Sequence, residues 1–235
     1  MAVNLAVRHP TRERMDDPAL PPAELGDALG GLARLNAWTR SAAGLSRRIR
    51  ALARLTPDRP LRVLDIASGG GDVPIRIERA VAMAGFHIEV DGCDVQPVAV
   101  EFATRAANRV RSHARFFVHD VLRDPLPDGY DVVMSSLFLH HLSDDEAVFA
   151  LRRMAAAGRV VFVTDLVRSR LALAQVWLAC RLLTRSRVNW LDGPVSVRAA
   201  FTPAEAAALS RRAGWVDISV TRRRPCRFLL TGRAG

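Results

Sequence analysis

Apolar residues recur at helical spacing near the start of the chain and fall into short strand-like runs further on. Between residues 24 and 55 they lie three or four positions apart, which predicts two helices with a break near residues 41–44. Two prolines then end the helical pattern. We therefore expect residues 1–22, rich in proline and charge, to form an extended arm, and residues 23–57 to form a pair of cap helices.

After Pro60 short apolar runs alternate with longer segments of helical periodicity. Strands are predicted at residues 61–66, 87–93, 114–118, 130–135 and 158–164, and helices between them at residues 73–84, 97–111 and 144–156. This alternation is typical of a parallel sheet with helices on both faces. Because crossovers between parallel strands are right-handed, the pattern predicts a doubly wound α/β fold.

The C-terminal part departs from this alternation. Residues 166–200 predict a helical insertion, apolar and studded with arginine, and residues 201–214 predict one more helix. Strands are expected at 215–220 and 226–232, and the five residues between them permit only antiparallel pairing. The main domain is therefore expected to span residues 58–235, with seven strands, mostly parallel and closed by an antiparallel hairpin.

Composition places the chain among folded proteins without a membrane span. Hydrophobic residues make up 49% of it and charged residues 25%. The longest strongly apolar run, residues 171–180, is too short to cross a bilayer, and the N-terminus lacks an apolar signal segment. We expect a cytoplasmic protein with no stable membrane insertion. The three cysteines are scattered, which favours buried thiols over disulfides or a zinc cluster.

The net charge of +10 raises the question of a nucleic-acid partner. All 34 basic residues are arginine, spread along the chain in pairs and short runs, and no aromatic residues interleave those runs. Solvated surface charge is therefore the favoured interpretation, with a groove for a polyanion as the alternative. We expect no nucleic acid as a partner.

The turn "VLDIASGGGDVP" at residues 63–74 marks the expected ligand site. It joins the first predicted strand to a helix, the place where open parallel sheets bind ligands. Gly69 and Gly71 can adopt positive φ and expose bare backbone to a ligand. The turn lacks the third glycine of the dinucleotide-binding fingerprint. It also lacks the Gly-Lys-Ser/Thr end of a phosphate-binding loop. Asp65 and Asp72 instead suit a ligand with a positive centre.

This turn resembles the first motif of the class I S-adenosylmethionine-dependent methyltransferases. The family pattern is acid-x-Gly-x-Gly-x-Gly, and Asp65-x-Ala67-x-Gly69-x-Gly71 matches it with one substitution. Alanine at the first glycine position is also found in the ubiquinone and menaquinone methyltransferase branch. The resemblance implies a Rossmann-like sheet, S-adenosylmethionine as cofactor and S-adenosylhomocysteine as product.

Later segments extend the resemblance over residues 61–165 and 201–232. In "VDGCDVQP", Asp94 stands where the family holds the ribose hydroxyls, and in "FFVHDVLRDPLP", Asp120 stands where it faces the adenine amino group. The segment "YDVVMSSLFLHHL" resembles the fourth strand and the loop that lines the methyl donor. The cofactor-binding residues implied are Asp65, Ala67, Ser68, Gly69, Gly71, Asp94, Val95, Asp120, Val121 and Ser136.

The segments "SLFLHHL" and "DGPVSVRAAFTPAE" resemble uncharacterised bacterial methyltransferases often encoded with type III polyketide synthases. This implies a small lipophilic acceptor, with methylation at the hydroxyl of a phenolic or polyketide compound. The alternatives are C-methylation of a quinone-like ring, methylation of nucleic acid, and a non-catalytic cofactor-binding module. The loop after the fourth strand lacks the prolines of DNA amino-methylating enzymes, and the Pro225-Cys226 pair lies far along the chain.

Three residues are candidates for the base that removes a proton from the acceptor. His140 and His141 follow the fourth strand and Asp165 ends the fifth, although each can also act as a cap or packing residue. The candidate acceptor contacts are Trp38, Trp177 and Trp190, whose alternative role is to pack the cap. No metal site is expected, and the oligomeric state stays open, a homodimer included.

Overall fold

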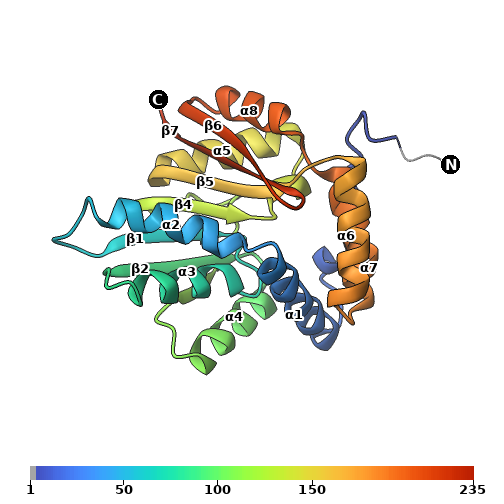
Figure 1. Ribbon diagram of the computed structural model, residues 1–235, viewed down its shortest axis with the longest axis horizontal. Coiled ribbons are helices and arrows are strands. Elements are labelled where there is room, and N and C mark those ends of the chain that lie inside the picture. Colours follow the sequence, from blue (N-terminus) through green and yellow to red (C-terminus); the bar gives the residue numbers. More distant parts are fainter. Residues whose placement is uncertain (1–3) are drawn as a thin grey trace.

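A computed structural model describes residues 4–235, built around one seven-stranded sheet with helices on both faces (Figure 1). The strand order is β3-β2-β1-β4-β5-β7-β6. The strands are β1 Leu61–Ile66, β2 Ile88–Asp94, β3 Arg115–Val118, β4 Tyr130–Ser136, β5 Gly158–Leu166, β6 Trp215–Arg223 and β7 Arg227–Ala234. The first five are parallel, and β7 runs antiparallel between β5 and β6. The predicted doubly wound α/β fold is confirmed.

Some of the helices begin at a side-chain cap. They are α1 Pro22–Trp38, α2 Ser41–Ala53, α3 Asp72–Ala82, α4 Pro97–Arg109, α5 Asp144–Ala157, α6 Arg170–Leu183, α7 Arg187–Ala199 and α8 Pro203–Arg212, with short 3₁₀ turns η1 Arg14–Asp16 and η2 Leu139–His141. Ser143 and Glu146 form a capping box at the start of α5, and Thr202 and Glu205 form another at α8. Such caps satisfy N–H groups that a helix leaves unpaired.

Two hydrophobic cores lie on the two faces of the sheet. On β1, Val63 packs with α2, α3 and α4, whereas its neighbour Leu64 packs with α5 and α8. On β4, Val132 and Val133 divide in the same way. Because successive side chains of a strand point to opposite faces, an uninterrupted apolar run fits a strand that is covered on both sides.

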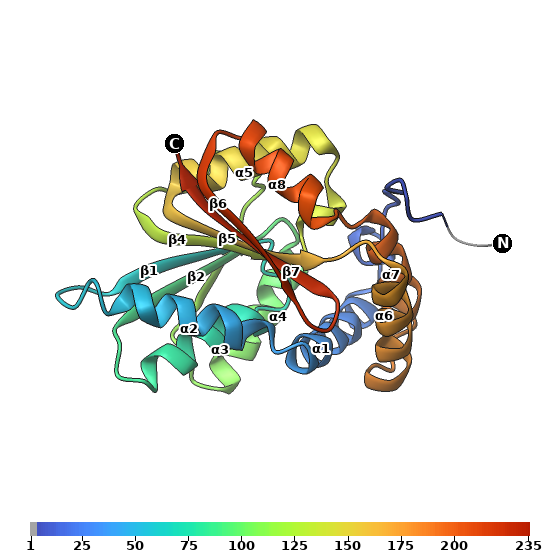
Figure 2. The same cartoon turned by 45° about the horizontal axis from the view of Figure 1, so that its top comes forward.

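Helices α1, α6 and α7 pack together as a cap (Figure 2). The cap lies near the ends of two strands, where β1 leads into the glycine-rich turn and β5 leads into α6. The break between α1 and α2 falls at Arg40, whose φ is 53°, slightly before the predicted residues 41–44. The expected insertion 166–200 contains two helices. No helix among the described residues has the length and apolar character that a membrane crossing requires.

The described part of the N-terminal arm is held against the cap. The backbone N–H of His9 donates to the carbonyl of Arg198 in α7. The side chain of Asp192, also in α7, accepts hydrogen bonds from the N–H groups of Arg14 and Met15. The arm was expected to be extended, and the structure adds the turn η1, which carries acidic residues toward the end of the sheet.

Candidate active site

The turn after β1 is held by the end of β2. The N–H of Gly69 donates to Oδ2 of Asp94 over 2.8 Å, and the N–H of Ser68 donates to the carbonyl of Cys93. Positive φ occurs at Ala67 (51°), Gly69 (52°) and Gly71 (72°), which reverses the chain sharply before α3. The motif therefore shapes a backbone loop that the second strand fixes in place.

The glycines of this turn serve different purposes. A Cβ on Gly71 would lie 2.7 Å from the ring of Phe116, so this position is tight against the protein itself. Gly69 and Gly70 face a cavity, whereas Gly71 is not part of its lining. The prediction that Gly71 exposes backbone to a ligand is corrected, because Phe116 of β3 fills that space.

The first cavity lies beyond the ends of β1, β2 and β4 and has a volume of about 200 Å³. Its lining includes Asp65, Ala67, Ser68, Gly69, Asp94, Val95 and Ser136, all expected from the sequence, together with Met15, Asp16, Leu29, Leu32, Asn36, Asp72, Leu137 and His141. Asp120 and Val121 are not among the lining residues. Asp120 pairs with Arg123, and Val121 packs in the core beneath α5.

Two acids in the first cavity have oxygens without a partner. Oδ1 of Asp65 and Oδ2 of Asp72 are buried and accept no hydrogen bond from the described residues. Burial raises the pKa of Asp65 well above its usual range, and the charges of Asp72 and Asp94 add to the effect. A buried carboxylate without a partner is costly, so this position suits a cationic group of a ligand.

A second, smaller cavity of about 90 Å³ adjoins the first. Met15, Leu32, Leu137 and His141 line both, and His141 is their only titratable shared residue. The other walls come from α1, α6, α7, the end of β5 and the arm. They combine apolar side chains, among them Leu35, Trp38, Leu166, Val176 and Ala179, with the polar residues Glu13, His140, Asn189, Asp192, Ser196 and Arg227. The first cavity is therefore the richer in acids, with Asp16, Asp65, Asp72 and Asp94, and His141 lines both cavities.

His140 is held in a buried ion pair rather than facing solvent. Its Nδ1 lies 2.7 Å from Oδ1 of Asp165, and its Nε2 lies 3.2 Å from Oε1 of Glu13. Burial opposes the charged ring, but the carboxylates of Asp165 and Glu13 outweigh it and raise the pKa of His140 to about 10. A ring that already holds its proton at neutral pH cannot accept another, which corrects the expectation that His140 acts as a base.

The carboxylate of Asp165 is occupied by hydrogen bonds beside His140. It accepts hydrogen bonds from the ring and the backbone N–H of His140 and from the N–H of Leu166. Burial acts to raise the pKa of Asp165, but the charged His140 lowers it below the usual value. Asp165 therefore positions the loop after β4, and its expected role as a base is corrected.

His141 has the placement expected of a base. Its Nδ1 lies 2.9 Å from Oδ2 of Asp16, and its ring is partly exposed in the wall between the cavities. A carboxylate that accepts from one ring nitrogen leaves the other nitrogen free to take a proton. Asp16 would thus orient His141 and stabilise the charged ring.

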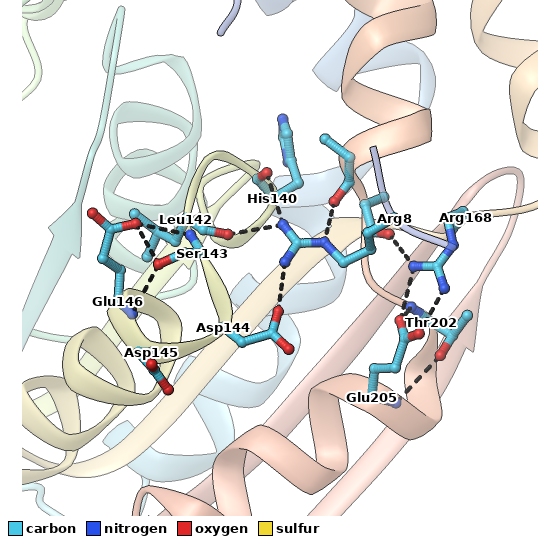
Figure 3. A network of polar contacts seen from close by, with 12 residues as sticks. Arg8, His140, Leu142, Ser143, Asp144, Asp145, Glu146, Arg168, Thr202 and Glu205 are labelled. Carbon is cyan, nitrogen blue, oxygen red and sulfur yellow. Dashed lines mark hydrogen bonds and ion pairs between the residues drawn. The ribbon is translucent and has the colours of Figure 1, made fainter. Parts of the chain in front are cut away.

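The N-terminal arm supplies residues that local sequence patterns did not indicate. Figure 3 shows Arg8 donating to the carbonyls of His140 and Leu142 and pairing with Asp144, at 2.8 Å for the ion pair. This anchor holds the arm against the loop after β4. Glu13 and Asp16 follow it, and they meet the histidines more than a hundred residues away.

One cluster could also be considered as a metal site. Glu13, His140 and His141 place one ligand atom each within 4.8 Å of one another. However, Glu13 and His140 already bind each other, and Oε1 of Glu13 also accepts from Ser196. These contacts account for the cluster as an ion-pair network.

A family model described as a methyltransferase domain matches residues 63–182. The chain belongs to this family of methyltransferase domains. The match runs from within β1 to α6, so it includes the ends of β1, β2, β4 and β5 at the cavities. The predicted class I S-adenosylmethionine-dependent methyltransferase is confirmed.

Two curated relatives of this chain are named demethylmenaquinone methyltransferase. The demethylmenaquinone methyltransferase of Thermus thermophilus is 32% identical over 130 residues, 54% of this chain and 57% of the relative. That of Deinococcus radiodurans is 30% identical over 129 residues, 54% of this chain and 48% of the relative. The chain spans about half the length of the curated relatives it matches.

Solved structures share the methyltransferase fold at low sequence identity. An O-methyltransferase from neocarzinostatin biosynthesis, in complex with S-adenosyl-L-homocysteine and 1,4-dihydroxy-2-naphthoic acid, has 19% identity and a TM-score of 0.67 over 95% of this chain and 62% of that one. Magnesium protoporphyrin IX methyltransferase from Synechocystis PCC 6803 has 17% identity and a TM-score of 0.60 over 94% and 92%. At these identities the likeness concerns the fold.

The residues of the first cavity fit the family's cofactor, S-adenosylmethionine. The unpartnered Oδ1 of Asp65 can accept from its cationic group, and Gly69 and Gly70 leave backbone open beside it. Both oxygens of Asp94 accept backbone N–H groups, of Gly69 and Gln96, and each retains a lone pair for a ribose hydroxyl. The contact of Asp120 with adenine stays a prediction.

The three candidate tryptophans take different positions relative to the cavities. Trp38 lines the second cavity, and its contact with the acceptor stays a prediction, whereas Trp177 lines a separate surface hollow and is 49% exposed. Trp190 donates its Nε1–H to the carbonyl of Thr184, and neither cavity includes it in its lining. The expected acceptor contacts at Trp177 and Trp190 are corrected. Successive helix residues point about 100° apart, so Val176 rather than Trp177 faces the cavity.

Proposed function

We propose that this chain transfers a methyl group from S-adenosylmethionine to a hydroxyl of a small lipophilic phenolic or polyketide acceptor. The observation that carries this proposal is the pair of adjoining cavities: one is rich in acids beside a bare turn, the other has a mainly apolar surface, and His141 lines both. When bound, the cofactor supplies an activated methyl group on a sulfonium. The protein's part is then to align the acceptor and exclude water.

His141 is assigned the proton transfer. A phenolic hydroxyl becomes a much stronger nucleophile when a base takes its proton, and an imidazole is the side chain that most often serves as such a base. Asp16 accepts from the Nδ1 side, which leaves Nε2 for the acceptor. The neighbouring ion pair of His140 and Asp165 holds the backbone from which His141 projects.

C-methylation of a quinone-like ring is the second candidate. The two demethylmenaquinone methyltransferases among the relatives favour it, and an apolar cavity suits a quinol ring equally well. A reduced ring with two hydroxyls would still use His141, because removal of the hydroxyl proton activates the adjacent ring carbon. A nucleic-acid substrate is less well supported, since the second cavity is small and enclosed by cap helices.

The test is methyl transfer from labelled S-adenosylmethionine to a panel of phenols and quinols, with the product analysed by NMR spectroscopy. A methyl group attached to oxygen supports the O-methyltransferase, and one attached to a ring carbon supports the second candidate. If neither class of acceptor is methylated by protein that binds the cofactor, the proposed acceptor class is wrong. A parallel assay with DNA and RNA oligonucleotides covers the nucleic-acid alternative.

A further inference from the structure

A larger hollow lies behind the second cavity, between α2 and the turn that joins β6 to β7. Its volume is about 860 Å³, and seven of its lining residues are arginines, whereas no aspartate or glutamate of the described chain lines it. We call this hollow the arginine cleft. Its arginines are Arg227 and, around it, Arg40, Arg47, Arg50, Arg76, Arg223 and Arg224.

Arg227 stands at the deepest part of this cluster and is only 5% exposed. Its Nη1 donates to Oγ of Ser41 and its Nη2 donates to Oδ1 of Asn36, both over 2.7 Å. Its Nε is buried without a partner among the described residues. Both partners are neutral, and burial lowers the pKa of Arg227. A buried guanidinium normally pairs with a carboxylate, because a lone buried charge is costly.

The arginine cleft and the second cavity share a wall. Trp38, Thr39 and Arg227 line both. The second cavity alone, at about 90 Å³, is smaller than the roughly 300–1,000 Å³ typical of small-molecule sites. An acceptor with its reacting ring in the second cavity would therefore extend past these three residues toward the cleft.

We propose that the acceptor carries an anionic group, a carboxylate or a phosphate, that binds to Arg227 and the arginine cleft while its apolar part lies in the second cavity. This inference rests on the proposed function and specifies its substrate class. A guanidinium binds a carboxylate or phosphate through two parallel N–H donors and is the side chain best suited to such groups. The surrounding arginines add favourable potential, and the two acids whose charges act on Arg227, Asp165 and Asp72, lie outside the lining of the cleft.

The burial of Arg227 distinguishes this site from a surface for nucleic acid. A polyanion backbone binds to exposed cations, and many surface arginines would serve that purpose equally. Here the buried arginine of the cleft, whose Nε has no partner among the described residues, is the one that also lines the second cavity. That position selects an anion attached to a small apolar molecule.

The experiment compares two probes that differ by one carboxylate, 1,4-dihydroxy-2-naphthoate and 1,4-dihydroxynaphthalene. Their dissociation constants are measured by calorimetry on protein saturated with S-adenosylhomocysteine. We expect the naphthoate to bind at least about tenfold more tightly, since a desolvated charge-assisted pair contributes that much or more. Coenzyme A forms a third arm, and its tighter binding would identify phosphate rather than carboxylate as the preferred anion.

Variants assign the preference to these residues. Arg227→Met should abolish the preference for the anionic probe while leaving the binding of 1,4-dihydroxynaphthalene within about twofold. Because Arg227 is buried and Arg227→Met can affect folding, the double variant Arg223→Gln with Arg224→Gln tests the outer cleft independently. The control is Arg152→Gln on α5, an exposed arginine outside the cleft, which should keep the full preference.

The inference would be overturned if the two naphthalenes bound with equal affinity. It would also be overturned if neither probe nor coenzyme A bound measurably. An unchanged preference in both the Arg227 and the double variant would do the same, as would tighter binding of a DNA duplex that depends on these arginines. Failure of the proposed function looks different. In that case S-adenosylhomocysteine itself would not bind, or anionic probes would bind through Arg227 without being methylated by the loaded protein.

Discussion

The Nδ1 atom of His140 lies 2.7 Å from Oδ1 of Asp165, at the ends of two adjacent strands and out of contact with solvent. This pairing divides the two neighbouring histidines between two tasks. His140 stays charged and holds the loop after β4, and His141 is left to face the cavities. The sequence "HH" alone does not indicate which ring does which.

Replacing His141 by alanine should reduce turnover by about 100-fold or more, the usual contribution of a general base. The affinity for S-adenosylhomocysteine should change less than about threefold, because the acids of the first cavity remain. Turnover from pH 6 to 9 and calorimetric titration would measure the two effects. The matched control, His87→Ala, removes a histidine outside both cavities. An unchanged pH profile in His141→Ala would exclude the residue as the base.

The ion pair of His140 predicts a loss of stability toward alkaline pH. The pKa of His140 is raised to about 10 by Asp165 and Glu13 despite its burial. A raised pKa means that its stabilisation is complete below the unfolded value of about 6.5 and is lost as the pH rises toward 10. Urea unfolding at a series of pH values should show this decline in wild-type protein. In His140→Gln the decline over the same range should be shallower. Parallel curves would refute the assignment.

The backbone at Ala67 predicts a stabilising substitution. Ala67 has a φ of 51°, a left-handed conformation that costs a non-glycine residue about 1–2 kcal/mol. Ala67→Gly removes this strain. The glycine also gives the unfolded chain more conformational entropy, which lowers the stability of the folded state by about 0.4–1 kcal/mol. We therefore expect a net increase of about 0.5–1 kcal/mol in the free energy of unfolding. The same change at the exposed helical Ala80 should instead reduce it by about 0.5–1 kcal/mol.

Structure that depends on near neighbours along the chain could be predicted from the sequence. The first strand was predicted at residues 61–66 and is found there, because an apolar run ends in a glycine-rich turn. Asp65 and Asp94 were placed at the cavity since the ends of adjacent parallel strands must meet at one edge of the sheet. Chemistry that follows from strand topology could therefore be predicted.

Contacts between distant segments could not be predicted in this way. Asp16 and His141 are 125 residues apart, and nothing in the arm's local pattern indicates that it returns to the sheet. The same holds for Glu13 and Arg227, which reach the cavity through packing of the arm and of the last hairpin. The position of Trp177 could not be predicted either, because α6 has apolar residues on several faces. The sequence of such a helix does not indicate which face lines the cavity.

The raised pKa of Asp65 leads us to expect weaker cofactor binding at low pH. Its pKa is raised by burial and then by Asp72 and Asp94, so the carboxyl takes up a proton at a higher pH than an exposed aspartate does. The neutral form cannot pair with a cationic ligand. Affinity for S-adenosylhomocysteine should therefore fall as the pH decreases, at a higher pH than an exposed aspartate would require, and more in wild-type protein than in Asp65→Asn. Identical pH dependence in the two proteins would contradict this role.

The account as a whole depends on the first cavity holding the cofactor, and the affinity of Asp94→Ala for S-adenosylmethionine tests this most directly. Asp94 secures Gly69 and has lone pairs left for the ribose, so its removal should weaken binding at least about tenfold by calorimetry. Asp128→Ala, at an exposed acid outside the cavity, should bind as wild type does. Wild-type affinity in a folded Asp94→Ala protein would contradict the account.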